Sequence, residues 1–180
     1  IVGTVLQDSD SQFVGLTVGE DIAFALENDC VSHDDMHARV QKVAQMVDMD
    51  AFLASSPYEL SGGQKQRTSL AGVLIDDVDI LLFDEPLANL DPATGKKAIE
   101  IIDDIHSTSQ KTILVIEHRL EDVLHREVSR VIVLDEGRIV ADIDAHSLVC
   151  SDLLQKTGIR EPLYITALKY AGVPLSCAML

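Results

Sequence analysis

The 180-residue chain lacks several features that would assign it to a particular class of protein. It has no apolar run of about 18 residues, the length that a helix needs to cross a bilayer. Basic residues are few, and 14 Lys and Arg against 30 Asp and Glu give a formal net charge of −16. Binding to a phosphate backbone needs a basic surface, so we expect no nucleic-acid partner. Long coiled-coil heptads, internal repeats and low-complexity segments are also missing from the sequence.

Cysteine is scarce as well. Cys30, Cys150 and Cys177 are far apart and odd in number, which fits neither a zinc-ligand pattern nor a disulfide framework. We therefore expect reduced, packed thiols in a cytosolic setting. A hydrophobic content of 47% and a charged content of 24% are typical of a globular domain with its own core.

The stretch Leu60–Arg67 predicts a loop that turns into a helix. Ser61 is a preferred N-cap residue, and Gln64 follows at the capping-box spacing. Gly62 and Gly63 come directly after the cap and allow the backbone to approach a ligand closely, because they carry no Cβ. Free amides and the positive end of the helix dipole suit an anion such as a phosphate. An ordinary capped surface helix would show the same short pattern.

A second stretch, Ile80–Phe83, is continuously apolar and ends in Asp84 and Glu85. A run of this kind, bounded by charge, predicts a strand buried on both faces. Carboxylates at the C-terminal end of such a strand face the crevice in which open α/β sheets bind ligands.

In their order and separation, these two stretches resemble the ATPase domain of an ABC transporter. Leu60–Arg67 corresponds to the signature motif and Ile80–Glu85 to the Walker B strand. The resemblance covers roughly residues 1–150 and implies an α/β fold like that of P-loop NTPases. A mainly parallel sheet would be flanked by helices, with an inserted helical subdomain over about 15–75 that includes the signature helix. Residues 151–180 would form a C-terminal extension or linker, as in energy-coupling-factor ATPases that carry two ATPase domains in one chain.

Other segments match the family in the same order. Gln7 follows the first apolar stretch at the place of the Q-loop glutamine, and residues 8–12 partly match the loop of energy-coupling-factor transporters. Thr17–Phe24 resembles the next segment of that subfamily, and Thr17 can cap a helix there. Asp91 corresponds to the D-loop aspartate and His118 to the H-loop histidine. Considered alone, the aspartate would be a helix cap and the histidine a packed or solvated residue.

The resemblance implies ATP and Mg²⁺ as cofactors, and it assigns roles around the domain's own ATP. Asp84 would hold Mg²⁺, directly or through water, and Glu85 would polarise the attacking water as general base. His118 would hydrogen-bond the γ-phosphate, and Gln7 would position the metal and the water. Hydrolysis of this kind depends on neutralising charge on the γ-phosphoryl group and holding a water in line.

A further set of residues would act on the ATP of a second ABC ATPase domain, in the same chain or in a homologous subunit. In the family the signature helix faces the opposite domain, so Ser61, Gly62, Gly63 and Gln64 would contact the γ-phosphate bound there. Asp91 would lie at the interface between the two domains.

One expected motif does not occur in the 180 residues. No Gly-x-x-x-x-Gly-Lys-Ser/Thr is present, although this loop and its lysine supply most phosphate contacts in P-loop enzymes. In the family it precedes the Q-loop. We therefore expect the chain to be a fragment without the N-terminal part of the domain, and to bind or hydrolyse ATP poorly by itself.

The remaining pattern predicts alternating helices and strands, and hence a mainly parallel sheet. The expected elements are a first strand over 1–6, a helix over about 33–48, a signature helix to about 75, a helix starting at Pro92 with Ile101, Ile102 and Ile105 on its apolar stripe, a second buried strand over 112–116, a strand over 130–134 with a hairpin-like return over 138–143, and a short helix-like stretch opened by 161–164.

Three functions fit these observations. The first is the ATPase subunit of an importer of the energy-coupling-factor type, which carries vitamins or metal ions and would pair with transmembrane subunits at the cytoplasmic face of the cell membrane. The second is a non-transport ABC ATPase that acts in DNA repair or on ribosomes, but such a protein should show long heptads or basic arms. The third is a non-catalytic half-site module, which would have no need of Glu85 and His118.

Overall fold

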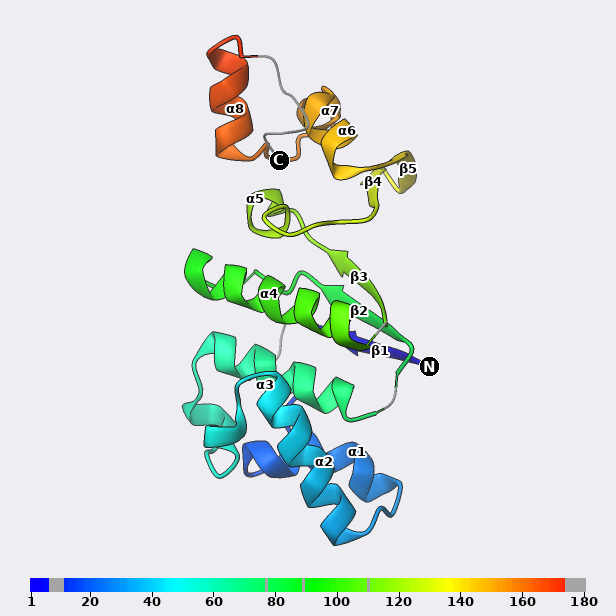
Figure 1. Ribbon diagram of the computed structural model, residues 1–180, viewed down its shortest axis with the longest axis vertical. Coiled ribbons are helices and arrows are strands. Elements are labelled where there is room, and N and C mark those ends of the chain that lie inside the picture. Colours follow the sequence, from blue (N-terminus) through cyan, green and yellow to red (C-terminus); the bar gives the residue numbers. More distant parts are fainter. Residues whose placement is uncertain (7–11, 77, 89, 110, 174–180) are drawn as a thin grey trace. The chain divides into compact units, whose positions relative to one another are not determined.

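The computed structural model describes residues 1–6, 12–76, 78–88, 90–109 and 111–173 of the chain. It divides into two compact units, Ile1–Glu117 and His118–Leu180 (Figure 1). Among the described residues, no helix is both long enough and apolar enough to cross a membrane.

The first unit contains a three-stranded parallel sheet. Its strands are β1 (Val2–Val5), β2 (Ile80–Asp84) and β3 (Thr112–Ile116), in the spatial order β1-β2-β3. Phe83 of the central strand pairs with Val5 on one side and with Val115 on the other. The expected parallel arrangement is therefore confirmed, and the carboxyl ends of the three strands lie at one edge of the sheet.

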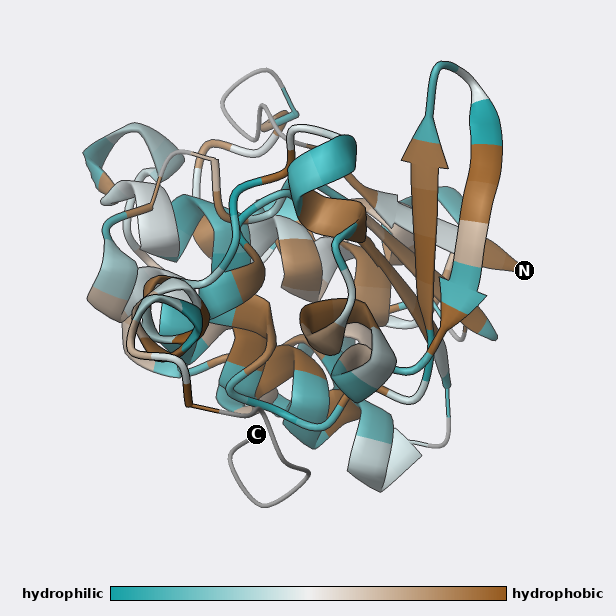
Figure 2. Ribbon diagram, turned by 90° about the horizontal axis from the view of Figure 1, so that it is seen from above, coloured by the Kyte–Doolittle hydropathy of each residue, from teal (hydrophilic) through white to brown (hydrophobic). Residues whose placement is uncertain are grey.

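The described residues of this unit also form helices and two short 3₁₀ turns. They are α1 (Val18–Asn28), α2 (His33–Met46), the turns Asp50–Phe52 and Pro57–Glu59, α3 (Gly62–Leu74) and α4 (Pro92–Ser109). Helix α3 contacts β1, α4, α1 and α2, so it joins the helical segment to the sheet (Figure 1). Figure 2 shows teal and brown residues alternating along the helices, as expected for helices that bury one stripe.

The helix boundaries follow from local capping. Thr17 and Glu20 form a capping box at the start of α1, with the Glu20 amide 3.2 Å from the Thr17 hydroxyl and the Thr17 amide 3.0 Å from the Glu20 carboxylate. Helix α2 ends at Met46, earlier than the expected residue 48. The reason is that Asp48 adopts a left-handed conformation with φ 55°, which cannot continue a right-handed helix.

The burial of strands β2 and β3 differs from what the sequence predicts. In β2, Leu81 and Phe83 are fully buried, whereas Leu82 on the other face is only half-buried. The expectation that β3 is a buried strand is wrong, because Leu114 is 47% exposed and Ile116 is 51% exposed. The exposed residues of β3 alternate along the strand and share one face, so that face has no covering layer among the described residues.

The cysteines also differ from expectation. Cys30 and Cys150 are free, but both are exposed rather than packed. Cys30 lies in the turn after α1 with a φ of 54°, and Cys150 is the last residue of the short helix α6 (Ala145–Cys150). Cys177 lies outside the described residues.

The second unit is built on a hairpin of β4 (Val131–Asp135) and β5 (Arg138–Ile143). Glu136 and Gly137 connect the strands with φ values of 46° and 74°, and two positive φ angles favour a tight hairpin turn. The other elements are α5 (Leu120–Val123), α6, α7 (Leu153–Lys156) and α8 (Leu163–Tyr170). Val133, Leu148 and Leu154 form the buried core between the hairpin, α6 and α7.

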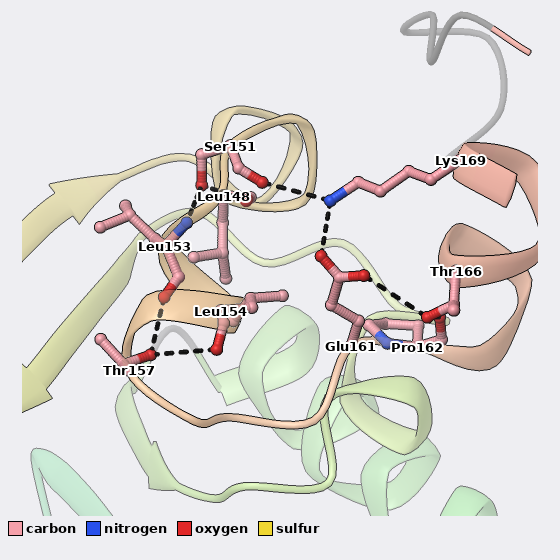
Figure 3. Close-up of polar contacts among 9 residues, drawn as sticks. All are labelled: Leu148, Ser151, Leu153, Leu154, Thr157, Glu161, Pro162, Thr166 and Lys169. Atoms are coloured by element: carbon pink, nitrogen blue, oxygen red, sulfur yellow. Dashed lines mark hydrogen bonds and ion pairs between the residues drawn. The ribbon is translucent and has the colours of Figure 1, made fainter. Parts of the chain in front are cut away.

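A partly buried polar cluster holds α8 in this unit (Figure 3). The Lys169 ammonium lies 2.5 Å from a carboxylate oxygen of Glu161 and donates to the Ser151 carbonyl at 3.2 Å. The Glu161 side chain is only 7% exposed. Its second oxygen accepts from the Thr166 hydroxyl at 3.4 Å, so one carboxylate joins the segment before α8 to two turns of the helix.

Candidate functional site

Asp84 and Glu85 lie where β2 ends, and both are half-buried. Glu85 adopts a left-handed conformation with φ 47°, which costs an L-residue about 1–2 kcal/mol. Its amide donates to the Ile116 carbonyl of β3 at 2.9 Å, so the neighbouring strand fixes the backbone at this point. Strained conformations of non-glycine residues cluster at functional sites, although Cys30, Asp48 and Glu136 adopt a similar φ in turns of this chain.

The turn after Glu85 is held by side chains from two other elements. The Gln66 side chain of α3 donates from Nε2 to the Pro86 carbonyl. On the other side, the Leu87 amide donates to the Glu117 carboxylate at 3.2 Å. Our sequence reasoning gave neither Gln66 nor Glu117 a role. The available signal was that Glu117 directly follows a strand, at the edge where the other strand ends are expected.

The start of α3 forms the capping box that the sequence predicts. The Gln64 amide lies 3.4 Å from the Ser61 hydroxyl, and the Ser61 amide donates to the Gln64 side chain at 2.9 Å. Gly62 is exposed, and the amides at this end of the helix have no acceptor within it. The local geometry therefore suits an anion at this end of α3.

Gly63 has a different environment from Gly62. It is buried, and a Cβ built on it would lie 2.4 Å from Cγ2 of Thr94 in α4. Its missing side chain is therefore needed for the close packing of two helix starts within the unit. The sequence suggested only that both glycines let a ligand approach.

Asp91 caps the start of α4. Its carboxylate accepts from the amides of Ala93 and Thr94 at 3.0 and 3.1 Å and from the Thr94 hydroxyl at 2.6 Å. The hydroxyl bond first, and the amide bonds after it, lower the pKa of Asp91 below its usual value of 3.8. The Thr94 that packs on Gly63 thus also binds Asp91, so the structure brings the signature glycine and the D-loop aspartate close to a shared residue.

The candidate residues are divided between the two units. Asp84 and Glu85 belong to the first unit, together with Ser61, Gly62, Gly63, Gln64 and Asp91. His118 is the first residue of the second unit, and Gln7 lies outside the described residues.

The carboxylates at the end of β2 are candidate ligands for a magnesium ion. Among the described residues, no group of three or more His, Cys, Asp or Glu could hold a metal ion. Mg²⁺ in nucleotide enzymes is usually bound by one or two carboxylates, with waters and substrate phosphates completing its shell. The carboxylate of Asp84 therefore fits Mg²⁺ bound together with a nucleotide, and it does not fit a metal site made of protein ligands alone.

Two family models match the sequence. The family described as ABC transporter matches residues 1–88, which include β2 and the signature helix. The family described as ATP-binding cassette cobalt transporter matches residues 151–179, which include α7 and α8.

Curated relatives match nearly the whole chain. A protein of Photobacterium profundum named as an ABC transporter ATP-binding protein is 64% identical over 176 residues, covering 98% of this chain and 31% of the relative. A Clostridium perfringens protein of the same name is 59% identical over 179 residues, covering 99% of this chain and 32% of the relative. The chain thus spans about a third of the length of these relatives.

Solved structures show the same fold. The cbiO1 protein of Clostridium perfringens, described as part of the ABC transporter complex cbiONQ, superposes with a TM-score of 0.79 at 26% identity, covering 93% of this chain and 67% of that one. The bacterial cassette MJ0796, in a dimeric post-hydrolysis state bound to ADP and Pi, gives a TM-score of 0.67 at 26% identity, covering 79% and 62%.

The motifs, the parallel sheet, the capped signature helix and these similarities agree with one another. The chain belongs to the ATP-binding domains of ABC transporters, in the energy-coupling-factor branch that includes the cobalt transporters.

Proposed function

We propose that this chain is part of a subunit that binds and hydrolyses ATP to power import of a vitamin or a metal ion through a membrane transporter. The observation that carries the proposal is the end of β2, where Asp84 and the strained Glu85 are adjacent and half-buried. In the same unit, the capped Gly-Gly start of α3 offers amides to a phosphate. The fold and family of the chain support this combination.

The adjacent carboxylates have separate roles in this proposal. Asp84 would hold Mg²⁺, which would supply charge neutralisation on the phosphate oxygens. Glu85 accepts a proton from the attacking water, since a carboxylate within reach of the water can act as general base. His118 and Gln7 complete the contacts to the γ-phosphate and the water, in keeping with their places in the family's motifs.

The proposed partners are a second ATP-binding domain and transmembrane subunits. Ser61, Gly62, Gly63 and Gln64 would contact ATP held by the second domain, and Asp91 would lie at the interface. The dimeric cassette and the cbiONQ complex among the solved neighbours are in keeping with this arrangement. The subunit would be peripheral, at the cytoplasmic face of the membrane.

We further propose that the chain works as part of a longer protein. Its length relative to the curated relatives and the missing P-loop motif support this view. Residues 1–150 would then be part of one ATPase domain and residues 151–180 an extension that links it to a neighbouring one.

The test is a substitution of Glu85 in the full-length protein. Glu85→Gln keeps the size of the side chain but removes the proton acceptor, so we expect ATP binding to persist and hydrolysis to slow by ~10²-fold or more. Steady-state phosphate release and titration with a fluorescent ATP analogue give the two quantities. The matched control is Glu27→Gln, because Glu27 is an exposed residue of α1. Near-normal turnover of Glu85→Gln would assign the base to another residue.

A further inference from the structure

Glu85 occupies a backbone conformation that its own residue type disfavours, so other groups must hold it there. The groups that contact the following two residues come from α3 and from the end of β3. We propose that Gln66 and Glu117 are positioning residues for Glu85, which they hold by a clamp on the Pro86–Leu87 segment. The inference rests on the proposed function, in which Glu85 is the general base.

The α3 side of the clamp is the Gln66 amide group. Its Nε2 donates to the Pro86 carbonyl, one residue beyond Glu85. Its Oε1 is buried and has no hydrogen-bond partner within the described part of the chain. Burying an amide oxygen without a partner is unfavourable, and an apolar side chain of similar length would avoid that cost. Compared with such an apolar side chain, the advantage of Gln66 is therefore the hydrogen bond that its Nε2 donates to the Pro86 carbonyl.

The β3 side of the clamp uses consecutive residues. The Ile116 carbonyl accepts from the Glu85 amide at 2.9 Å, and the carboxylate of the next residue, Glu117, accepts from the Leu87 amide at 3.2 Å. A hydrogen bond to a charged acceptor is stronger than one between neutral groups. The end of β3 thus fixes the backbone both at Glu85 and beyond it.

The two sides act on a short turn that a local backbone bond also closes. The Ala88 amide donates to the Glu85 carbonyl at 3.2 Å. If a side-chain bond to this turn is lost, Glu85 can relax toward a right-handed or extended conformation, which redirects its side chain. A misplacement of about 1 Å of a reacting group can slow catalysis by ~10²-fold. Both bonds therefore contribute to the rate of hydrolysis, although neither side chain needs to touch the nucleotide.

The proposal can be tested in the full-length protein with substitutions that separate a hydrogen bond from a charge. Glu117→Ala removes the acceptor, whereas Glu117→Gln keeps an acceptor oxygen and removes the charge. Gln66→Met keeps the approximate length of the side chain and removes the donor. The matched controls are Glu27→Ala in α1 and Gln41→Met in α2, because both residues are exposed.

We expect Glu117→Ala and Gln66→Met each to lower kcat by roughly tenfold, with the Kd for ATP changed by less than about twofold. Glu117→Gln should keep kcat within about threefold of wild type, because its amide oxygen still accepts from Leu87. The double variant should lose less than the product of the single losses, since both bonds hold the same turn. The melting temperature of each variant, compared with its control, shows whether the fold is intact.

Each result supports or overturns a separate statement. Normal kcat in both Gln66→Met and Glu117→Ala would overturn the clamp. So would a kcat in Glu117→Gln as low as in Glu117→Ala, because the charge of Glu117 would then matter rather than its bond to Leu87. A folded Gln66→Met that loses ATP affinity and kcat together would assign Gln66 to general packing. If Glu85→Gln hydrolyses ATP normally in the same assay, it is the proposed base assignment that fails.

Discussion

Asp91 and Thr94 show how a few hydrogen bonds set the charge state of one residue at the start of α4. The Asp91 carboxylate is exposed to solvent, yet its pKa is held below 3.8, mainly by the bond from the Thr94 hydroxyl. The same threonine packs against Gly63. The charged form of Asp91 is thus favoured by a residue that also fixes the start of the signature helix.

We predict that Thr94→Val raises the pKa of Asp91 toward its usual value, because the largest cause of the lowered pKa is removed. A carboxyl with a lowered pKa stabilises the fold at pH values above its unfolded pKa, and this stabilisation is lost as the pH falls through its folded pKa. The loss of stability as the pH falls below about 3.8 should therefore be smaller in Thr94→Val than in the wild type. Carboxyl-carbon NMR titration of Asp91 measures the pKa directly, and an unchanged value would contradict the prediction.

Helix α8 illustrates stabilisation at the scale of an element. It carries Lys169, whose side chain is 28% exposed and whose ammonium lies between the Glu161 carboxylate and the Ser151 carbonyl. The partner Glu161 is nearly buried. A buried carboxylate that loses its partner is costly, whereas a solvated ion pair contributes little.

We predict that Lys169→Met lowers the free energy of unfolding of the second unit by about 1–3 kcal/mol, because it leaves the Glu161 charge without its cation. This value is below that of a fully buried pair, since the Lys169 side chain is partly exposed. Adding Glu161→Gln should recover part of the loss. The matched control is Lys156→Met, whose pair with Asp152 is exposed on both sides and should cost at most about 1 kcal/mol. Urea unfolding of the wild type and the three variants measures these differences, and equal losses for Lys169→Met and Lys156→Met would contradict the argument.

For the whole molecule, the two groups of candidate residues imply two different nucleotide sites. Asp84 and Glu85 lie at the end of β2, where they would serve the nucleotide of their own domain. Ser61 opens α3, and under the proposed function it faces the nucleotide of a second domain. One domain would then contribute to two sites that can be perturbed separately.

We predict that Ser61→Arg and Asp84→Asn affect different sites in the full-length protein. Ser61→Arg should crowd the γ-phosphate held by the partner domain, whereas Asp84→Asn should weaken Mg-ATP in this domain's own site by removing a metal-directed charge. Photo-crosslinking of an ATP analogue, followed by peptide mapping, shows which P-loop is labelled. Ser61→Arg should spare labelling of this domain's own P-loop, and Asp84→Asn should reduce it. Loss of label at one and the same P-loop in both variants would rule out the arrangement.

The sequence alone determined the features that depend on near neighbours in the chain. Capping at Thr17 and Ser61, the start of α4 at Pro92 and the hairpin turn at Glu136–Gly137 follow from local side chains and backbone preferences. The motif order was sufficient to predict the parallel α/β fold and the candidate residues Asp84 and Glu85.

Only the tertiary structure decided which distant residues meet. The contact of Gly63 with Thr94, the bonds of Gln66 and Glu117 to the turn after Glu85, and the exposed face of β3 all depend on how helices and strands pack. The physical reason is that a capping box acts over a few residues, whereas packing joins residues whose separation in the chain carries no periodic signal. A glutamine in a helix and a glutamate after a strand look ordinary until the fold places both beside a strained residue.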